Sequence, residues 1–345
     1  GIFFLDELDE SDLISKGKAK QNTKGMSAAD RRITQLEKVK MIDFSPFIDI
    51  EGLKEEISTW EYPLHFIDFE TAMVALPFYK NSKPYEGIAF QFSHHQVNAD
   101  GSIEHKGQFL ETTPGYFPNF DFVRELKNQL DKDNGSIFRY HNHENTFLNL
   151  MHRQIFASSL ADVPDKEELM LFIQSITHNT EDKVLKWKGE RDMIDLADLV
   201  FRYYFPPQAK GSYSIKKILP AVIENSEFIK NKYSKPIYGG NTEIKSLTYH
   251  QPKIWISEEW NNDPYKSLEA VFDEDEEDEF EESETGIEEI HQGGAAATAY
   301  ARLQFSHIPD YEREKVRQAL LHYCELDTLA MVMIWEYWKN EINKN

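Results

Sequence analysis

The stretch LHFIDFE, residues 64–70, decides the fold of this 345-residue chain. It is apolar on both faces up to Asp68, which is typical of a strand inside a sheet. Strand side chains alternate with a period of two, so Asp68 and Glu70 point to the same face, roughly 6 to 7 Å apart along the strand. This pair favours a divalent cation held by oxygen ligands, and the alternative is a strand end that emerges into solvent.

Further elements follow from this strand outward. Two strands are expected at 87–97 and 102–111, joined by a turn over residues 98–101 that ends in Asp100-Gly101. The apolar spacing then predicts alternating helices and short strands: a helix at 117–130 with Asn119 as its cap, a strand at 136–140, helices at 144–156 and 166–176, a strand passing into a helix at 193–205, a short capped helix at 210–223, an Ala-rich helix from about 294, and a long helix at 310–343. The order predicts a layered α/β or α+β fold.

The two flanks of this pattern have opposite charge. Residues 1–60 are expected to form a helical lead-in or a linker from a longer protein, and residues 16–40 carry a net charge of +6. Residues 258–289 hold 16 acids against one Lys, so the net charge of −22 falls to −7 outside them. A local basic surface is therefore compatible with the acidic total. We expect residues 224–290 to be the least regular, with a solvated acidic insertion at about 258–290 in a single domain spanning 61–345.

Composition excludes several classes of protein. The single Cys324 leaves no disulfide framework, cysteine zinc site or iron–sulfur cluster within the chain. Apolar runs fall short of the roughly 18 to 20 residues of a membrane span, and there is no signal peptide, so we expect a cytoplasmic protein without a membrane partner.

The long C-terminal helix has an acid within its apolar stripe. The stripe runs through Val316, Leu320, Tyr323, position 327, Ala330 and Ile334, and position 327 is Asp327. A buried acid needs a partner. Tyr323 lies one turn earlier on the same face, whereas His322 lies about 140° away around the helix. A plain buried Asp bonded to a Tyr or a backbone group is the alternative.

A third polar cluster lies between the strand at 136–140 and the following helix. It includes Asn142 and Glu144. They either cap the helix and complement its dipole, or they bind a metal ion or a phosphate. His141 and His143 lie two residues apart, which is not the spacing of helical zinc ligands.

In this order the motifs resemble the DnaQ-like (DEDD) 3′–5′ exonuclease superfamily of the ribonuclease H-like fold. FIDFET is similar to its first motif and carries Asp68 and Glu70. Glu144 falls where the second motif has its acid, usually Asp, and YCELD, residues 323–327, is similar to the third motif in its tyrosine form. The resemblance implies a mixed sheet flanked by helices.

A closer resemblance covers most of residues 60–340. Six blocks in order are similar to a bacterial family known as domain of unknown function 2779: PLHFIDFETAMVALPFY, YEGIAFQFSHH, MIDLADLV, KGSYSIKKILPAV, GGAAATAYARLQ and LLHYCELDTLAMV. In that family the domain often follows an N-terminal region that resembles RecB-type nucleases, so such a region of the same longer protein is a suspected partner.

The superfamily resemblance implies a two-metal nuclease using Mg²⁺ or Mn²⁺, acting on single-stranded DNA or RNA. Asp68 would bridge two ions, Glu70 and Asp327 would bind the ion beside the attacking water, and Glu144 would bind the other. Tyr323 would orient the water. Weaker candidates for substrate contacts are Thr71, Asn142, Lys210, Ser212 and Lys216, and the favoured alternative for the last three is a surface turn and cap. Asp195 is the reserve for the fourth acid and His322 the reserve for Tyr323.

Two other functions stay open. The domain could be an inactive ribonuclease H-like module that binds nucleic acid or acts as a scaffold. It could instead hydrolyse another phosphoester. The acidic insertion either mimics nucleic acid in the groove or is a variable, solubilising loop.

Overall fold

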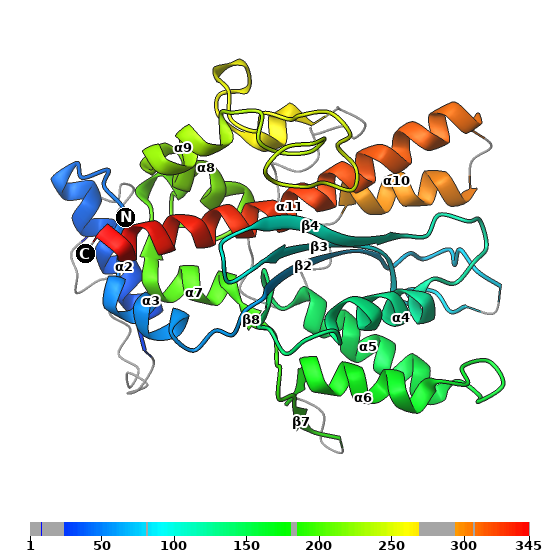
Figure 1. Ribbon diagram of the computed structural model, residues 1–345. Coiled ribbons are helices and arrows are strands. Elements are labelled where there is room, and N and C mark those ends of the chain that lie inside the picture. Colours follow the sequence, from blue (N-terminus) through cyan, green and yellow to red (C-terminus); the bar gives the residue numbers. More distant parts are fainter. Residues whose placement is uncertain are drawn as a thin grey trace.

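A mixed five-stranded sheet with helices on both faces forms the centre of the protein (Figure 1). The structure is a computed structural model, and it describes residue 8 and residues 24–80, 82–180, 185–268, 294–305 and 308–344. The strand order is β4-β3-β2-β5-β8. Strand β3 is antiparallel to both neighbours, while β5 and β8 run parallel to β2. The predicted α/β layered fold is thus confirmed at the level of a mixed sheet flanked by helices.

The central strand β2, Leu64–Ala72, is buried along its length, with Asp68 half-buried. It continues four residues beyond Asp68, so this acid does not lie at a strand end that emerges into solvent. Strands β3, Ile88–Val97, and β4, Ile103–Leu110, form the predicted hairpin. Gly101 adopts a φ of 86° and donates its N–H to the Asn98 carbonyl, which explains why the turn needs glycine there.

The lower face of the sheet in Figure 1 is covered by α4, Asn119–Leu130, α5, His143–Ala157, and α6, Lys166–Ile176. These helices bury Ile67 and Phe69 of β2 in one apolar cluster. Asn119 is not the helix cap that the sequence predicted. Its side chain accepts from Ala89 N–H and donates to the Gly87 carbonyl, which ties α4 to the start of β3.

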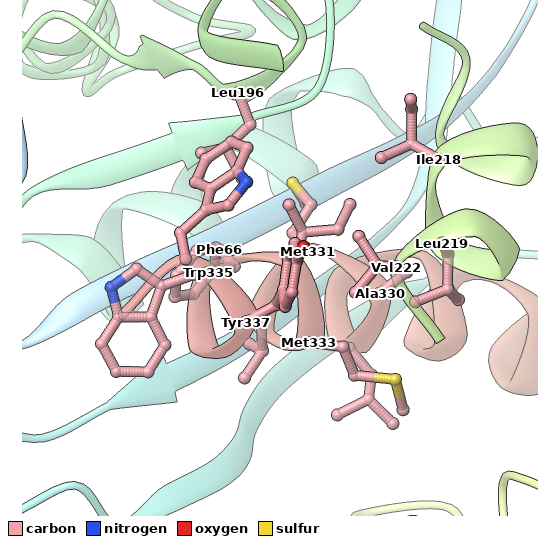
Figure 2. Packing of buried hydrophobic residues seen from close by; sticks show 14 of the residues in the cluster. Phe66, Leu196, Ile218, Leu219, Val222, Ala330, Met331, Met333, Trp335 and Tyr337 are labelled. Atoms are coloured by element: carbon pink, nitrogen blue, oxygen red, sulfur yellow. The ribbon is translucent and has the colours of Figure 1, made fainter. Parts of the chain in front are cut away.

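The other face is crossed by α11, Asp310–Lys344, drawn in red in Figure 1. It packs on β2, on α7, Leu196–Tyr203, and on α8, Ile215–Asn225, through the cluster in Figure 2 that includes Phe66, Leu196, Leu219 and Trp335. The short strands β5, Ile137–Arg139, and β8, Ile194–Asp195, complete the sheet beside β2. Helix α10, Gly294–Phe305, lies beside the start of α11 and packs on Phe90 through Tyr300.

The described part of the lead-in packs on the rest of the fold. It forms α2, Ala28–Met41, β1, Phe47–Ile48, and α3, Ile50–Ile57. Strand β1 pairs with β9, Tyr204–Phe205, and buried Arg31 donates to the carbonyls of Val200, Phe201 and Tyr204. Residues 24–60 are therefore a packed part of this fold and do not form a free linker.

The expected irregular stretch contains more structure than its sequence suggested. Helix α9, Glu227–Tyr233, and two 3₁₀ turns, η3, Glu258–Trp260, and η4, Pro264–Ser267, lie within it. The acidic insertion was therefore placed too early, because residues 258–268 are ordered by turn-forming hydrogen bonds. Most of the predicted insertion, residues 269–290, lies outside the described residues.

The remaining described elements are short. They are β6, His178–Asn179, paired with β7, Trp187–Lys188, and the 3₁₀ turn η2, Pro207–Ala209. Among the described residues, no helix combines the length and the apolar character needed to cross a membrane.

Candidate metal centre

Strand β2 directs Asp68 and Glu70 toward α11. Their neighbours Ile67 and Phe69 pack on the opposite face against α4, as the alternation of a strand requires. Cys324 of α11 donates its thiol toward the Asp68 carboxylate and carbonyl, with Sγ 3.6 Å from each oxygen. Ligand atoms of Asp68, Glu70 and Cys324 all lie within 4.8 Å of one another. The predicted common face of the two acids is confirmed.

Glu144 reaches the same region because β5 runs parallel to β2. His65 pairs with Ile137 and Phe66 with Phe138, so the chain leaves β5 level with Asp68. His141 takes a positive φ of 69° in the connection, and α5 begins two residues later. Glu144 then lies in the first turn of α5, almost fully buried. Carboxyl ends of parallel strands meet at one sheet edge, which brings Glu144 beside the β2 acids.

Asp327 and Tyr323 come from the middle of α11, one turn apart on one face. Asp327 is buried and Tyr323 is half-buried, as the broken apolar stripe predicted. The Lys216 ammonium lies 5.3 Å from the centre of the Tyr323 ring. His322 instead stacks on Tyr249, with ring centres 4.2 Å apart, so its ring faces a different part of the fold. This agrees with the helix geometry, which favours Tyr323 because His322 lies about 140° away from Asp327 around the helix.

The four carboxylates interact electrostatically. Burial raises the pKa of Asp68 well above its ordinary value, and the charges of Asp327, Glu144 and Glu70 raise it further, in that order of size. Like charges disfavour ionisation only where they lie close together. Side chains from β2, α5 and α11 therefore converge, although Asp68 and Asp327 are 259 residues apart in sequence.

Tyr265 of η4 is a member of this site that sequence reasoning missed. Its hydroxyl donates to Asp327 Oδ1 at 2.5 Å, and its ring centre lies 6.3 Å from that of Tyr323. Burial, followed by the charge of Asp327, raises the pKa of Tyr265 well above its ordinary value, so the phenol is a neutral donor. The signal was weak because Tyr265 precedes Asp327 by 62 residues in a segment without periodicity.

The weaker candidates differ in the contacts that their side chains make. Thr71 and His143 share a 2.9 Å hydrogen bond at the β2 and α5 ends, and burial lowers the pKa of His143 to about 4. Asn142 occupies the cap position of α5 without a capping hydrogen bond from its side chain. Lys216 borders the site through Tyr323.

Lys210 and Ser212 belong to the turn before α8. Lys210 is an exposed residue with a φ of 53°, and the Ser212 hydroxyl accepts from the Ser214 N–H. Ser214 stands at the cap position of α8 without a side-chain capping bond. This geometry fits a turn, and no contact described for Lys210 or Ser212 joins either of them to the four acids.

Asp195, the reserve acid, has a different environment. Its Oδ2 lies 2.9 Å from Arg139 Nη1, and its Oδ1 accepts from the His141 and Ala197 N–H groups. The carboxylate thus caps α7 and neutralises a buried arginine. Glu144, and not Asp195, is among the acids that raise the pKa of Asp68.

The donor set fits a hard divalent cation. Four carboxylates offer the oxygen ligands that Mg²⁺ and Mn²⁺ prefer, and a cation would relieve the repulsion that raises the pKa of Asp68. Cys324 adds a sulfur atom beside two of these acids. Burial raises the pKa of its thiol well above the ordinary value, and the charge of Asp68 raises it further, so the group is a neutral thiol.

Comparison with known families agrees with part of the sequence analysis. Residues 65–214 match the model of a family described as a domain of unknown function, DUF2779. No curated protein and no solved structure matched the chain. The matched range includes Asp68, Glu70 and Glu144 and ends before α11, which supplies Tyr323 and Asp327.

Proposed function

We propose that this protein is a divalent-metal-dependent nuclease that removes nucleotides from the 3′ end of single-stranded DNA or RNA. The observation that carries the proposal is the convergence of acids from separate elements: ligand atoms of Asp68, Glu70 and Cys324 lie within 4.8 Å of one another, and Glu144 and Asp327 lie close enough for their charges to act on Asp68. Concentrating four acids destabilises a fold unless something compensates, and cation binding is the usual compensation.

In this proposal, Asp68 and Glu70 from β2, Glu144 from α5 and Asp327 from α11 hold two Mg²⁺ or Mn²⁺ ions. Bound ions of this kind lower the pKa of a water molecule and stabilise the charge on a leaving oxygen during phosphodiester hydrolysis. The protein contributes the rigidity of the site. Strand β2 is central in the sheet and α11 is buried over most of its second half, so the acids are held on firm elements.

Two side chains at the border of the cluster have roles in the same reaction. The Tyr323 hydroxyl orients the attacking water by a hydrogen bond. It does not act as the base, because an ordinary phenol is neutral at pH 7. The Lys216 ammonium lies over the Tyr323 ring and offers a positive charge to a substrate phosphate beside the acids.

The choice of a nuclease rests on the resemblance to the DnaQ-like superfamily. The acids follow its order along the chain: two lie on β2, the first strand of the five-stranded sheet, one lies in the first turn of α5, and one lies on α11 four residues after Tyr323. A mixed sheet with helices on both faces agrees with a ribonuclease H-like fold. These two correspondences favour the nuclease over a phosphoesterase for small substrates.

Two measurements test the proposal. Isothermal titration with Mn²⁺ should detect binding to the wild type and its loss in Asp68→Asn and Asp327→Asn. With Mn²⁺ present, 5′-labelled single strands of DNA and RNA should shorten from the 3′ end, and both variants should lose this activity. Asp198→Asn is the matched control, because Asp198 is an exposed acid of α7 paired with Arg202.

The outcomes separate the proposal from its rival. Mn²⁺ binding without shortening of either strand would refute the nuclease and favour a binding module that retains the site. Shortening that persists in both Asn variants would remove these acids from the reaction.

A further inference from the structure

Three tyrosines that come from outside α11 donate hydroxyl hydrogens to acids of this helix. Tyr233 donates to Glu336 Oε2 at 2.7 Å, Tyr238 to Glu325 Oε1 at 2.5 Å, and Tyr265 to Asp327 Oδ1 at 2.5 Å. The first two pairs lie within the packed interior, and all four of their side chains are buried. The third pair is different, because its acceptor belongs to the acidic cluster.

The turn that carries Tyr265 is held in place from several sides. Asp263 caps η4 by accepting from the Tyr265 N–H at 3.2 Å, and the Ser267 hydroxyl donates to the Pro264 carbonyl at 2.7 Å. Lys253 donates to the Ser267 carbonyl, and the Tyr265 ring packs on the apolar cluster beneath α11. The hydroxyl therefore meets Asp327 at the end of a constrained segment.

A carboxylate that binds a metal ion is commonly held by a hydrogen bond to its other lone pairs, which fixes its orientation. The Tyr265 hydroxyl is such a donor, since it meets one oxygen of Asp327 at 2.5 Å. The same carboxylate follows Cys324 by three residues on α11, and the Cys324 thiol lies 3.6 Å from an Asp68 carboxylate oxygen, so Asp327 lies beside the acids of β2, in agreement with its charge contribution to Asp68.

We infer that Tyr265 is a positioning residue, which orients the Asp327 carboxylate for a divalent cation shared with Asp68. This role rests on the proposed function, because it needs a metal ion at the cluster. It assigns the segment at 263–267 to the site, although nothing in the motif pattern of the chain includes that segment. Tyr265 touches no reacting atom in this role and acts through Asp327 alone.

The chain provides a matched control in Tyr233. Its hydroxyl also donates to an acid of α11, but Glu336 lies nine residues beyond Asp327, about 13.5 Å along the helix axis. Tyr233→Phe and Tyr265→Phe remove the same atom and the same kind of hydrogen bond. Both retain the ring and its packing, so both variants should fold.

The experiment measures Mn²⁺ affinity by isothermal titration, together with the rise in Tm that saturating Mn²⁺ produces. Loss of such an outer hydrogen bond typically weakens metal binding about 10- to 100-fold. We expect a loss of that size in Tyr265→Phe and a smaller Mn²⁺-induced rise in its Tm. Tyr233→Phe should lower the Tm of the metal-free protein and bind Mn²⁺ as the wild type does.

Each result has one meaning. Equal Mn²⁺ affinity in Tyr265→Phe and the wild type would overturn the positioning role while leaving the metal site intact. An equal loss in Tyr265→Phe and Tyr233→Phe would assign both effects to general stability and would also overturn it. A wild type that binds no Mn²⁺ would refute the proposed function itself, and the role of Tyr265 with it.

Discussion

The buried acid Glu325, two residues before Asp327, provides the sharpest stability prediction. Its Oε1 lies 3.0 Å from His105 Nδ1 and accepts from the Tyr238 hydroxyl, and the hydroxyls of Ser246 and Thr248 donate to its carboxylate. Burial by itself raises the pKa of Glu325, but the charges of His105 and His95 together with the hydrogen bonds to His105 and Ser246 lower the pKa to about 2. The ionised carboxylate thus ties α11 to β4 and to the 238–248 segment.

The replacement Glu325→Gln should destabilise the protein by about 3 kcal/mol at pH 7. The ordinary pKa of 4.5 falls to about 2, and each unit corresponds to about 1.36 kcal/mol. Glutamine resembles the protonated acid, so the variant loses what ionisation contributes. Because the folded pKa is lowered, this contribution is present above about pH 4.5 and disappears as the pH falls toward 2.

Urea unfolding followed by far-ultraviolet circular dichroism at pH 7 measures this loss. Glu314→Gln is the matched control on the same helix, because Glu314 is exposed and its contacts with Arg317 at 3.5 Å and Gln318 at 2.8 Å lie at the surface, so the change should alter stability by less than about 0.5 kcal/mol. A loss below about 1 kcal/mol in Glu325→Gln would refute the argument, since a neutral group would then satisfy the same donors equally well.

Three further predictions concern other parts of the fold. Leu329→Ala, at a fully buried position of α11, should lower the free energy of unfolding by about 2 to 5 kcal/mol in urea, and a much smaller loss would show that the core closes over the gap. Asp195→Asn should cost about 3 to 5 kcal/mol in the same assay by leaving the buried Arg139 uncompensated, with Mn²⁺ binding by titration unchanged. Burial lowers the pKa of His94 and His95 well below the ordinary 6.5, so the unfolded chain binds more protons than the folded one, and stability should fall as the pH drops below about 6.5. Calorimetry at pH 6 in buffers of different ionisation enthalpy should detect this proton uptake on unfolding, and a measurement without uptake would contradict the prediction.

The elements that local sequence rules predict are the ones with a clear period or turn. The β3–β4 hairpin follows from alternation and from Asp100-Gly101, and the length of α11 follows from the spacing of its apolar residues. Helix α9 was missed because its apolar residues give too short a pattern over seven positions. Asn119 was misassigned because its side chain bonds to β3, a contact 30 residues away that no local rule contains.

In the candidate site too, local patterns predict some residues, and contacts between distant segments decide the others. Strand alternation alone puts Asp68 and Glu70 on one face, and the interrupted stripe identifies Asp327. The choice of Glu144 over Asp195 depends on what each carboxylate contacts, and the Arg139 pair of Asp195 is visible only in the folded chain. Tyr265 lies in a segment ordered by caps and turns, so no periodic signal marks it.

The acids of the site and the stability of α11 depend on each other. Bringing Asp327 beside Asp68, Glu70 and Glu144 raises the pKa of Asp68 and opposes the docking of α11 on the sheet. The same helix buries Leu326, Leu329 and Trp335, and it accepts hydrogen bonds from Tyr233 and Tyr238 away from the cluster. These contacts hold α11 in place against the repulsion. A cation that binds only the folded cluster would remove that repulsion, so metal binding and the docking of α11 should strengthen each other.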